Sequence, residues 1–242
     1  MKTDILGVNI DDLTPEEAVA AGSSLIEKEG FHYAVTPNPE FILTAKQDEQ
    51  FRAVLNSADL ALADGIGVVY AAKILGRPLK GKVSGIDFAQ GLLASMAQTG
   101  RTIFLLGAKP GVADRAAENL RTAHPGLIIC GTHDGYFQDD TPVVEEIRAT
   151  KADVIFVCLG APKQELWMVQ HGPDTGARLA VGLGGSLDVF AGTVERAPDA
   201  WQKAGMEWLY RLIKEPNRFG RMARLPLILV DALATRLGRE QA

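Results

Sequence analysis

Cysteine is scarce in this sequence of 242 residues, which holds only Cys130 and Cys158. Both lie within short apolar runs, so we interpret them as buried thiols and not as a disulfide framework or a zinc site. The sequence also lacks an apolar run of about 18 residues, which argues against a helix that spans a membrane. A basic region followed by an apolar stretch is missing at the N-terminus, so we expect no secretory signal and a cytoplasmic protein.

Several motifs of catalytic and cofactor sites are missing as well. The four histidines have no metal-ligand spacing such as H-E-x-x-H, and no Asp-x-Asp is present to hold the divalent metal of many nucleotide-sugar enzymes. The serine-hydrolase elbow G-x-S-x-G, the dinucleotide fingerprint G-x-G-x-x-G and the P-loop are absent too. We therefore expect no metal ion and no other cofactor, and a dinucleotide-dependent oxidoreductase is disfavoured.

The composition is that of a globular domain. Hydrophobic residues make up 47% and charged residues 23% of the chain, a balance that suits one α/β domain of this length. The formal net charge is −5, so we expect no nucleic-acid partner. The charge is unevenly spread, because residues 211–242 carry +4 and residues 1–210 carry −9. This asymmetry indicates an anionic partner near the C-terminal end.

Short apolar runs alternate with amphipathic stretches over most of the chain. We predict strands at 5–10, 32–36, 60–63, 102–106, 127–130, 154–159 and 178–181. We predict helices at 15–28, 66–75, 88–98, 112–123, 142–150 and 162–170. This alternation is typical of a Rossmann-like α/β fold, a mostly parallel sheet with helices on both faces. Only helical patterns follow residue 198, which predicts an α/β core at 1–198 and a helical C-terminal appendage at 199–242.

The turns that follow the strands are the candidate ligand site, because open parallel sheets bind ligands at the carboxyl ends of their strands. One glycine-rich turn begins at Gly107, and another contains Gly184 and Gly185. Glycine lets backbone N–H groups approach a phosphate closely, and a helix N-terminus adds a favourable dipole. Together the two turns favour a nucleotide diphosphate. The alternative is that both simply join a strand tightly to a helix.

Polar residues follow two other predicted strands. Asp64 is placed where a carboxylate can accept a proton from a bound hydroxyl. The alternative is that Asp64 caps the helix at 66–75. Thr36 and Asn38 flank a proline, and this stiff segment would pre-orient their side chains toward a ligand. For Asn38 the alternative is again a helix cap, with a proline at the first helical position.

The C-terminal segment combines basic and apolar residues. Basic side chains, among them Arg211, Arg218 and Arg221, recur every three or four residues, and a short apolar run follows at 225–230. A helix with a basic and an apolar face suits the surface of an anionic membrane, where each basic residue contributes about 1 kcal/mol. The alternatives are a solvated face packed on the body and a contact between subunits of a homo-oligomer.

These features fall within eight segments of the chain: TPNPEFILTA (36–45), ADGIGVVYAAKILG (63–76), SGIDF (84–88), FLLGAKPGVA (104–113), DGYF (134–137), VCLGAPKQELW (157–167), VGLGGSLDVFAGTVERAP (181–198) and EWLYRLIKEPNRFGR (207–221). In this order they resemble the WecG/TagA/CpsF family of bacterial glycosyltransferases. The family transfers a sugar from a UDP-sugar to a lipid-linked saccharide at the cytoplasmic membrane face. Its products feed teichoic acid, enterobacterial common antigen or exopolysaccharide.

The resemblance implies an inverting transferase that needs no metal ion, in agreement with the missing Asp-x-Asp. It implies a UDP-sugar donor, a polyprenyl-diphosphate-linked acceptor and a peripheral position at the inner face of the membrane. The donor sugar stays open among N-acetylmannosamine, its uronate, glucose and glucuronic acid. A non-catalytic nucleotide-binding module that uses the same glycine turns is the alternative function.

The resemblance also implies roles for single residues. Asp64 matches the aspartate regarded as the family's general base, which removes a proton from the acceptor hydroxyl. Thr36, Asn38 and Gln164 match residues of the sugar pocket, and Asp188 matches a polar residue at the pocket wall.

Charge on the departing UDP would be stabilised by N–H groups of the glycine turns and by arginines of the tail. Arg211, Arg218 and Arg221 match the family's C-terminal appendage, which is thought to reach the membrane and close over the active site. Lys82 departs from the family pattern, in which arginine is frequent at this position. Lysine keeps the charge but loses the bidentate fork of arginine toward a phosphate or a sugar.

Overall fold

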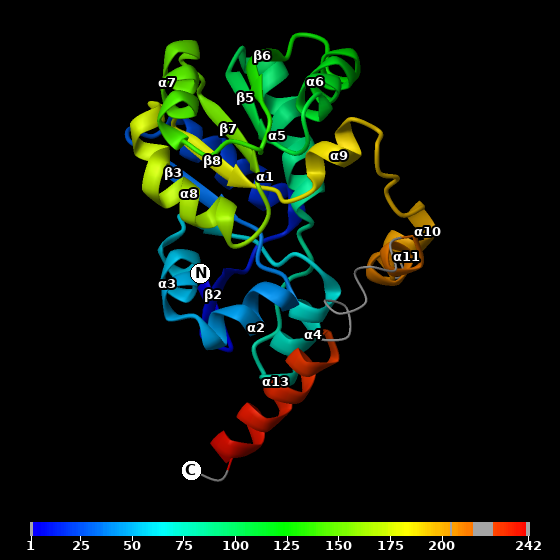
Figure 1. The fold of residues 1–242 in the computed structure, drawn as a ribbon. Coiled ribbons are helices and arrows are strands. Elements are labelled where there is room, and N and C mark those ends of the chain that lie inside the picture. Colours follow the sequence, from blue (N-terminus) through cyan, green and yellow to red (C-terminus); the bar gives the residue numbers. More distant parts are fainter. Residues whose placement is uncertain (1, 204, 215–224, 241–242) are drawn as a thin grey trace.

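The main sheet is parallel, as the alternation of strands and helices predicts (Figure 1). The structure is a computed structural model that describes residues 2–203, 205–214 and 225–240. The strand order is β4–β3–β8–β7–β5–β6, and each neighbouring pair is parallel. The strands are β3 (His32–Val35), β4 (Leu60–Ala61), β5 (Thr102–Gly107), β6 (Ile128–His133), β7 (Val154–Cys158) and β8 (Leu179–Gly182). The Rossmann-like α/β fold is confirmed.

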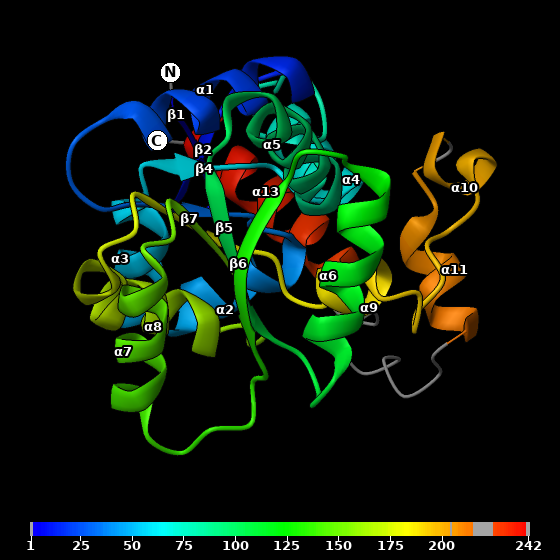
Figure 2. The same ribbon diagram turned by 90° about the horizontal axis from the view of Figure 1, so that it is seen from above.

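Helices cover both faces of this sheet (Figures 1 and 2). One face carries α1 (Pro15–Glu27), α5 (Gly85–Thr99), α6 (Val112–Ala123) and the short α9 (Ser186–Phe190). The other carries α2 (Pro39–Gln47), α3 (Glu49–Ser57), α7 (Asp140–Thr150) and α8 (Lys163–His171), which the 3₁₀ turn η1 (Gly172–Thr175) follows. Successive residues of β7 point into different cores: Val154 and Phe156 into the first, Ile155 and Val157 into the second. A central strand buried on both faces explains its continuous apolar sequence.

The prediction of a single strand at 5–10 is wrong. The chain instead forms an antiparallel hairpin of β1 (Lys2–Ile5) and β2 (Val8–Asp11). Leu6 and Gly7 make the turn, with φ of 54° and 92°. Two-residue hairpin turns commonly need positive φ at both central positions, which glycine adopts freely and leucine rarely. The apolar Leu6 therefore gives no turn signal in the sequence.

Two helices that the apolar pattern does not predict, α2 and α3, lie between β3 and β4. Each begins at a polar N-cap. The Oδ1 of Asn38 accepts from the N–H of Phe41 at 3.1 Å, and the Oδ1 of Asp48 accepts from the N–H of Phe51 at 2.9 Å. The helix-cap alternative for Asn38 is thus confirmed, and the cap fixes Asn38 just beyond the carboxyl end of β3.

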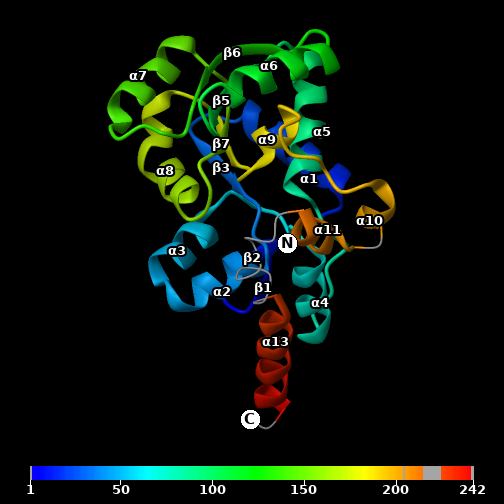
Figure 3. The same ribbon diagram turned by 45° about the vertical axis from the view of Figure 1, so that its right-hand side comes forward.

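The described part of the C-terminal segment consists of helices, apart from the turn at residues 205–206, which confirms its predicted helical character. The helices α10 (Asp199–Lys203) and α11 (Glu207–Lys214) lie to one side of the sheet, and α13 (Leu225–Glu240) projects away from it (Figures 1 and 3). Helix α13 packs on α2 and α4 (Ile66–Ile74), and it buries Ile228 and Ala232 completely. An ion pair of 2.6 Å joins Lys46 to Asp231. Among the described helices, none is long and apolar enough to cross a membrane.

Candidate active site

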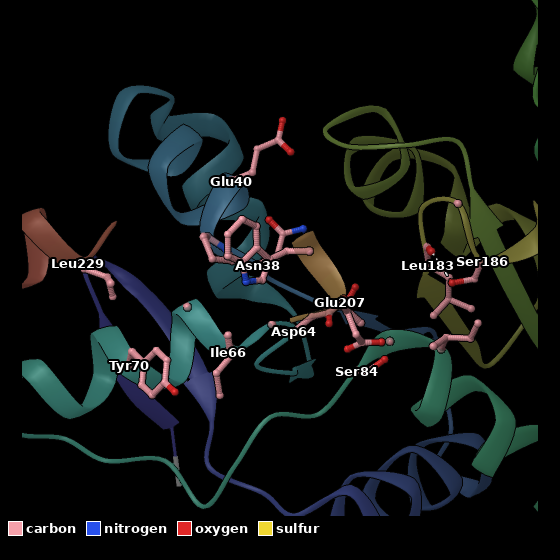
Figure 4. A pocket seen from close by; sticks show the side chains of 18 of the residues that line it. Asn38, Glu40, Asp64, Ile66, Tyr70, Ser84, Leu183, Ser186, Glu207 and Leu229 are labelled. Carbon is pink, nitrogen blue, oxygen red and sulfur yellow. Dashed lines mark hydrogen bonds between the residues drawn. The ribbon is translucent and has the colours of Figure 1, made fainter. Parts of the chain in front are cut away.

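The turns after β3, β4 and β8 open into one cavity of about 490 Å³ (Figure 4). The starts of α2 and α5, helices α4 and α11, and the first residues of α13 complete its walls. This is the edge of a parallel sheet where ligands are expected, because the carboxyl ends of the strands meet there. The volume suits a small-molecule substrate.

Asp64 lines this cavity just after β4. Its backbone N–H donates to the carbonyl of Pro37 at 3.0 Å, which joins the segments that follow β3 and β4. The N-cap of α4 is Gly65, at a φ of 97°, and no side chain caps that helix. The helix-cap alternative for Asp64 is therefore wrong. Its half-buried carboxylate is part of the cavity wall (Figure 4).

Thr36 and Asn38 line the cavity together with Asp64. The hydroxyl of Thr36, which is buried, donates to the carbonyl of Gly182 at 3.1 Å and ties the end of β3 to the end of β8. Asn38 uses its Oδ1 to cap α2, and its amide N–H groups are the atoms that it can offer to a ligand. The segment after β3 thus brings a hydroxyl and an amide to the same cavity as the carboxylate.

Further polar residues of the cavity are not singled out by the sequence motifs. They are Glu40, Ser84, Ser186 and Glu207. Ser84 and Ser186 stand at the starts of α5 and α9, so a serine at a helix start after a strand or turn is a signal that could have found them. Glu207 comes from the appendage, and no spacing in the sequence predicts that this helix reaches the cavity.

The opposite end of the cavity is apolar. Ile66 and Tyr70 of α4 and Leu229 of α13 contribute to it (Figure 4), and Trp208 of α11 is a further large apolar residue of the lining. Tyr70 is 52% exposed and Trp208 is 39% exposed, although both are large side chains that gain from burial. Figure 4 shows Asp64 between this apolar end and the turn after β8. The cavity therefore offers a polar region beside the carboxylate and an apolar region beside α4 and α13.

A network of ion pairs fastens α11 to the core. Lys82 does not line the cavity, but its Nζ makes a short ion pair with the Oε2 of Glu207, which does. Arg196 lies 2.7 Å from the Oδ1 of Asp87 through its Nη1 and 3.8 Å from the Oε1 of Glu207 through its Nε. The side chains of Lys82, Arg196 and Glu207 are only about a fifth exposed, so salt screens these pairs less than it screens pairs in open solvent.

Gln164 lies behind the cavity wall and is 1% exposed. Its Oε1 accepts the N–H of Gly184 at 2.9 Å, and its Nε2 donates to the Oε1 of Glu165 at 2.6 Å. Gly184 has a φ of 55°, and its neighbours Leu183 and Gly185 both line the cavity. Gln164 thus reaches the cavity wall through a backbone hydrogen bond and does not itself line the cavity.

Two other predicted residues lie outside the cavity lining. Asp188 is in α9, with its Oδ2 3.8 Å from the place of a Cβ on Gly185. Gly107 ends β5, where a Cβ would lie 2.3 Å from the carbonyl oxygen of Cys158. The turn that begins at Gly107 joins β5 tightly to α6, which is the alternative considered for the glycine turns. The turn after β8 also leads into a helix, α9, but it lines the cavity as well.

Three arginines of the appendage complete the set of predicted residues. Arg211 belongs to α11, of which the structure describes the helix but not this side chain. Arg218 and Arg221 lie outside the described residues. Within the described ranges, no group of three or more histidine, cysteine, aspartate or glutamate side chains could hold a metal ion.

Comparison with known proteins identifies the family of this chain. The sequence matches the model of the glycosyl transferase WecG/TagA/CpsF family over residues 3–242. The chain belongs to this family. It is therefore a glycosyltransferase. The match confirms the resemblance to this family that the sequence motifs indicate. The alternative of a non-catalytic nucleotide-binding module is set aside.

Relatives with assigned activities include proteins of Bacillus and Staphylococcus. An N-acetylglucosaminyldiphosphoundecaprenol N-acetyl-beta-D-mannosaminyltransferase of Bacillus spizizenii strain W23 is 40% identical over 83% of this chain and 78% of its own length. Proteins of the same name from Staphylococcus aureus strains MW2 and MRSA252 are 34% identical over 94% of this chain and 91% of their own length.

Proposed function

We propose that this chain transfers N-acetylmannosamine, or a closely related sugar, from a UDP-sugar to N-acetylglucosaminyl-diphospho-undecaprenol. The names of the relatives from Bacillus and Staphylococcus support this donor group and this acceptor. The observation that carries the proposal is the cavity in which Asp64 lies with Thr36 and Asn38 at the carboxyl edge of the sheet. A cavity with a polar and an apolar end suits an acceptor that joins a sugar diphosphate to a lipid.

Asp64 is the general base of a single displacement in this proposal. Its carboxylate accepts the proton of the acceptor hydroxyl while that hydroxyl oxygen attacks the anomeric carbon of the donor. The bond from the anomeric carbon to UDP breaks, and its electron pair leaves with the UDP oxygen. Attack from the side opposite the leaving group inverts the anomeric centre. Because the sequence has no Asp-x-Asp, we propose that UDP departs without a metal ion.

The residues near Asp64 hold the sugars in our proposal. The amide of Asn38 donates to a sugar oxygen, and the hydroxyl oxygen of Thr36 accepts from the sugar while its own proton stays hydrogen-bonded to the carbonyl of Gly182. Asp188 supports the turn after β8 from α9. Lys82 exchanges its partner Glu207 for an oxygen of the substrate, which places a cation at the cavity only when a ligand is bound.

Hydrogen-bond donors and cations of the protein stabilise the negative charge that develops on UDP. Gln164 already accepts the N–H of Gly184, so we assign the phosphate contact of this turn to Gly185, which lines the cavity. The turn that begins at Gly107 lies outside the cavity lining, and in our proposal its N–H groups add to the stabilisation of UDP from there. The arginines of the appendage that match the family pattern add positive charge: Arg211, Arg218 and Arg221.

The appendage also brings the enzyme to its lipid-linked acceptor in our proposal. Helix α13 buries Ile228 against the core and exposes Leu227, Val230 and Leu237 by 51%, 62% and 49%. These residues recur at helical spacing, and the basic segment precedes them in the sequence. An apolar stripe beside basic residues favours binding at an anionic membrane surface. We therefore propose a peripheral position at the inner face of the cell membrane.

A donor panel tests this function. Purified protein is incubated with N-acetylglucosaminyl-diphospholipid and, one at a time, UDP-N-acetylmannosamine, its uronate, UDP-glucose and UDP-glucuronic acid, with and without EDTA. We expect one donor to give a disaccharide lipid at the same rate in EDTA, with inverted configuration at the anomeric carbon by NMR. Retained configuration would contradict the single displacement, and loss of transfer in EDTA would contradict the metal-free step.

A further inference from the structure

Glu165 is a completely buried acid in the first turn of α8. Its Oε1 accepts the hydrogen bond from the Nε2 of Gln164 at 2.6 Å, and within the described residues its Oε2 has no hydrogen-bond partner. A buried carboxylate with one unpartnered oxygen is strongly disfavoured in its charged form. Burial accordingly raises the pKa of Glu165 to about 7, against the opposing effect of the hydrogen bond from Gln164. The neutral acid predominates below that pH.

Among the described residues, no other charge sets the pKa of Glu165. Burial is the largest cause, and the only other causes are hydrogen bonds from Gln164 and from the backbone. The elements packed against α8 are β3, β7, β8, α3 and η1. The charged or titratable groups on these elements and on α8 itself, none of which contributes to the shift, are His32, Tyr33, Glu49, Arg52, Cys158, Lys163, His171 and Asp174.

The hydrogen bond to Glu165 decides how the amide of Gln164 is turned. Because Glu165 accepts the Nε2 of Gln164, the Oε1 of Gln164 is directed to the N–H of Gly184. A reversed amide would set its Nε2, a donor, against the N–H of Gly184, another donor, and leave that N–H without its acceptor. Glu165 and Gly184 are therefore linked through one side chain.

The same two side chains also touch the beginning of the turn after β8. A Cβ on Gly182 would lie 3.0 Å from the Nε2 of Gln164 and 3.2 Å from the Oε1 of Glu165. On its carbonyl side, Gly182 accepts the hydroxyl of Thr36. The turn is thus held from α8 and from β3, and its residues 183, 185 and 186 form a wall of the cavity that contains Asp64.

We propose that Glu165 is a positioning residue for sugar transfer, which acts through Gln164 to hold the turn at residues 182–186 as a wall of the cavity. The inference rests on the proposed function for its kinetic consequence, but the link from Glu165 to Gly184 does not depend on it. Ionisation of Glu165 would favour entry of water or movement of the side chain, and the turn would lose its support. Transfer should therefore decline as the pH rises through about 7.

Two substitutions separate the parts of this role. Glu165→Gln keeps an acceptor for Gln164 and cannot ionise, whereas Glu165→Leu removes the acceptor at similar size. We expect Glu165→Gln to keep kcat within about twofold of the wild type at pH 6 and to lack the decline above pH 7. We expect Glu165→Leu to lower kcat by about tenfold or more with a smaller change in KM for the donor. Gln164→Leu should lower kcat as much as Glu165→Leu does. The double variant with both substitutions should lower kcat no further than either one alone, because the two residues act through the same series of hydrogen bonds.

Amide hydrogen exchange at Gly184 provides a readout that needs no substrate. Protection of this N–H should persist in Glu165→Gln and fall by about tenfold in Glu165→Leu. Glu145→Gln, on the exposed face of α7, is the control for an acid-to-amide change. Unchanged exchange in a folded Glu165→Leu would overturn the inference, as would a pH profile of Glu165→Gln identical to that of the wild type. If Glu165→Leu does not fold, the pH profile and exchange of Glu165→Gln decide. Absence of transfer in the wild type with every donor would instead overturn the proposed function and leave the exchange result to judge this inference.

Discussion

The buried acid Glu165 should make the stability of the protein fall as the pH rises. Burial moves its pKa from an ordinary value of 4.5 to about 7 in the folded chain. Between these two values the unfolded chain loses this proton while the folded chain keeps it, so rising pH favours the unfolded state. The stability that neutral Glu165 contributes is fully present below pH 4.5 and is lost once the pH has passed about 7. The difference corresponds to about 3 kcal/mol of unfolding free energy.

Urea unfolding of the wild type and of Glu165→Gln, from pH 4.5 to pH 8, measures this effect. Other groups titrate over the same range, so the informative quantity is the difference in unfolding free energy between the two proteins at each pH. Glutamine cannot ionise, and we expect the variant to gain about 3 kcal/mol on the wild type between the two ends of the range. Glu145→Gln should show no such gain. A difference between Glu165→Gln and the wild type that stays constant with pH would refute the assignment of a buried, neutral acid.

Two further predictions concern packing. Ile228 is completely buried, so Ile228→Ala should weaken the docking of α13 by about 2–5 kcal/mol, measured by hydrogen exchange along α13. Leu227→Ala, on the exposed face, should change the docking free energy by less than about 0.5 kcal/mol. Equal effects of the two substitutions would contradict the described packing of this helix. Gly107→Ala should cost about 2–5 kcal/mol in urea unfolding, because its φ is 128° and the Cβ would lie 2.3 Å from the carbonyl oxygen of Cys158. Gly81→Ala, whose Cβ meets nothing within 4 Å, is the control, and a tolerated Gly107→Ala would show that β5 and β7 approach less closely.

The sequence predicted the sheet well, since strands buried on both faces have continuous apolar runs. It failed where a local conformation contradicts the residue type. Leu6 takes a positive φ that leucine rarely adopts, and the hairpin it forms is invisible to an apolar pattern. The helices α2 and α3 were missed for another reason. Their signals are the caps Asn38 and Asp48, and the first of these was weighed as a site residue as well as a cap.

The candidate site was predictable in part. Residues at strand ends converge because a parallel sheet gathers its carboxyl ends at one edge, and Thr36, Asn38 and Asp64 accordingly share a cavity. Contacts between distant parts of the chain carry no such rule. The pairing of Lys82 with Glu207, 125 residues apart, depends on where the appendage packs, which spacing does not reveal.

The measurement that tests the central claim most directly is transfer by Asp64→Asn. Asparagine keeps the size of the side chain but cannot take up the proton of the acceptor hydroxyl at neutral pH. The variant is compared with the wild type in EDTA, with the active donor of the panel, and with Asp139→Asn, which keeps a residue able to cap α7 away from the cavity. We predict that Asp64→Asn unfolds like the wild type, still binds UDP, and transfers sugar at least about 100-fold more slowly, while Asp139→Asn retains transfer. Transfer by Asp64→Asn at the rate of the wild type would contradict the role of Asp64 as the general base.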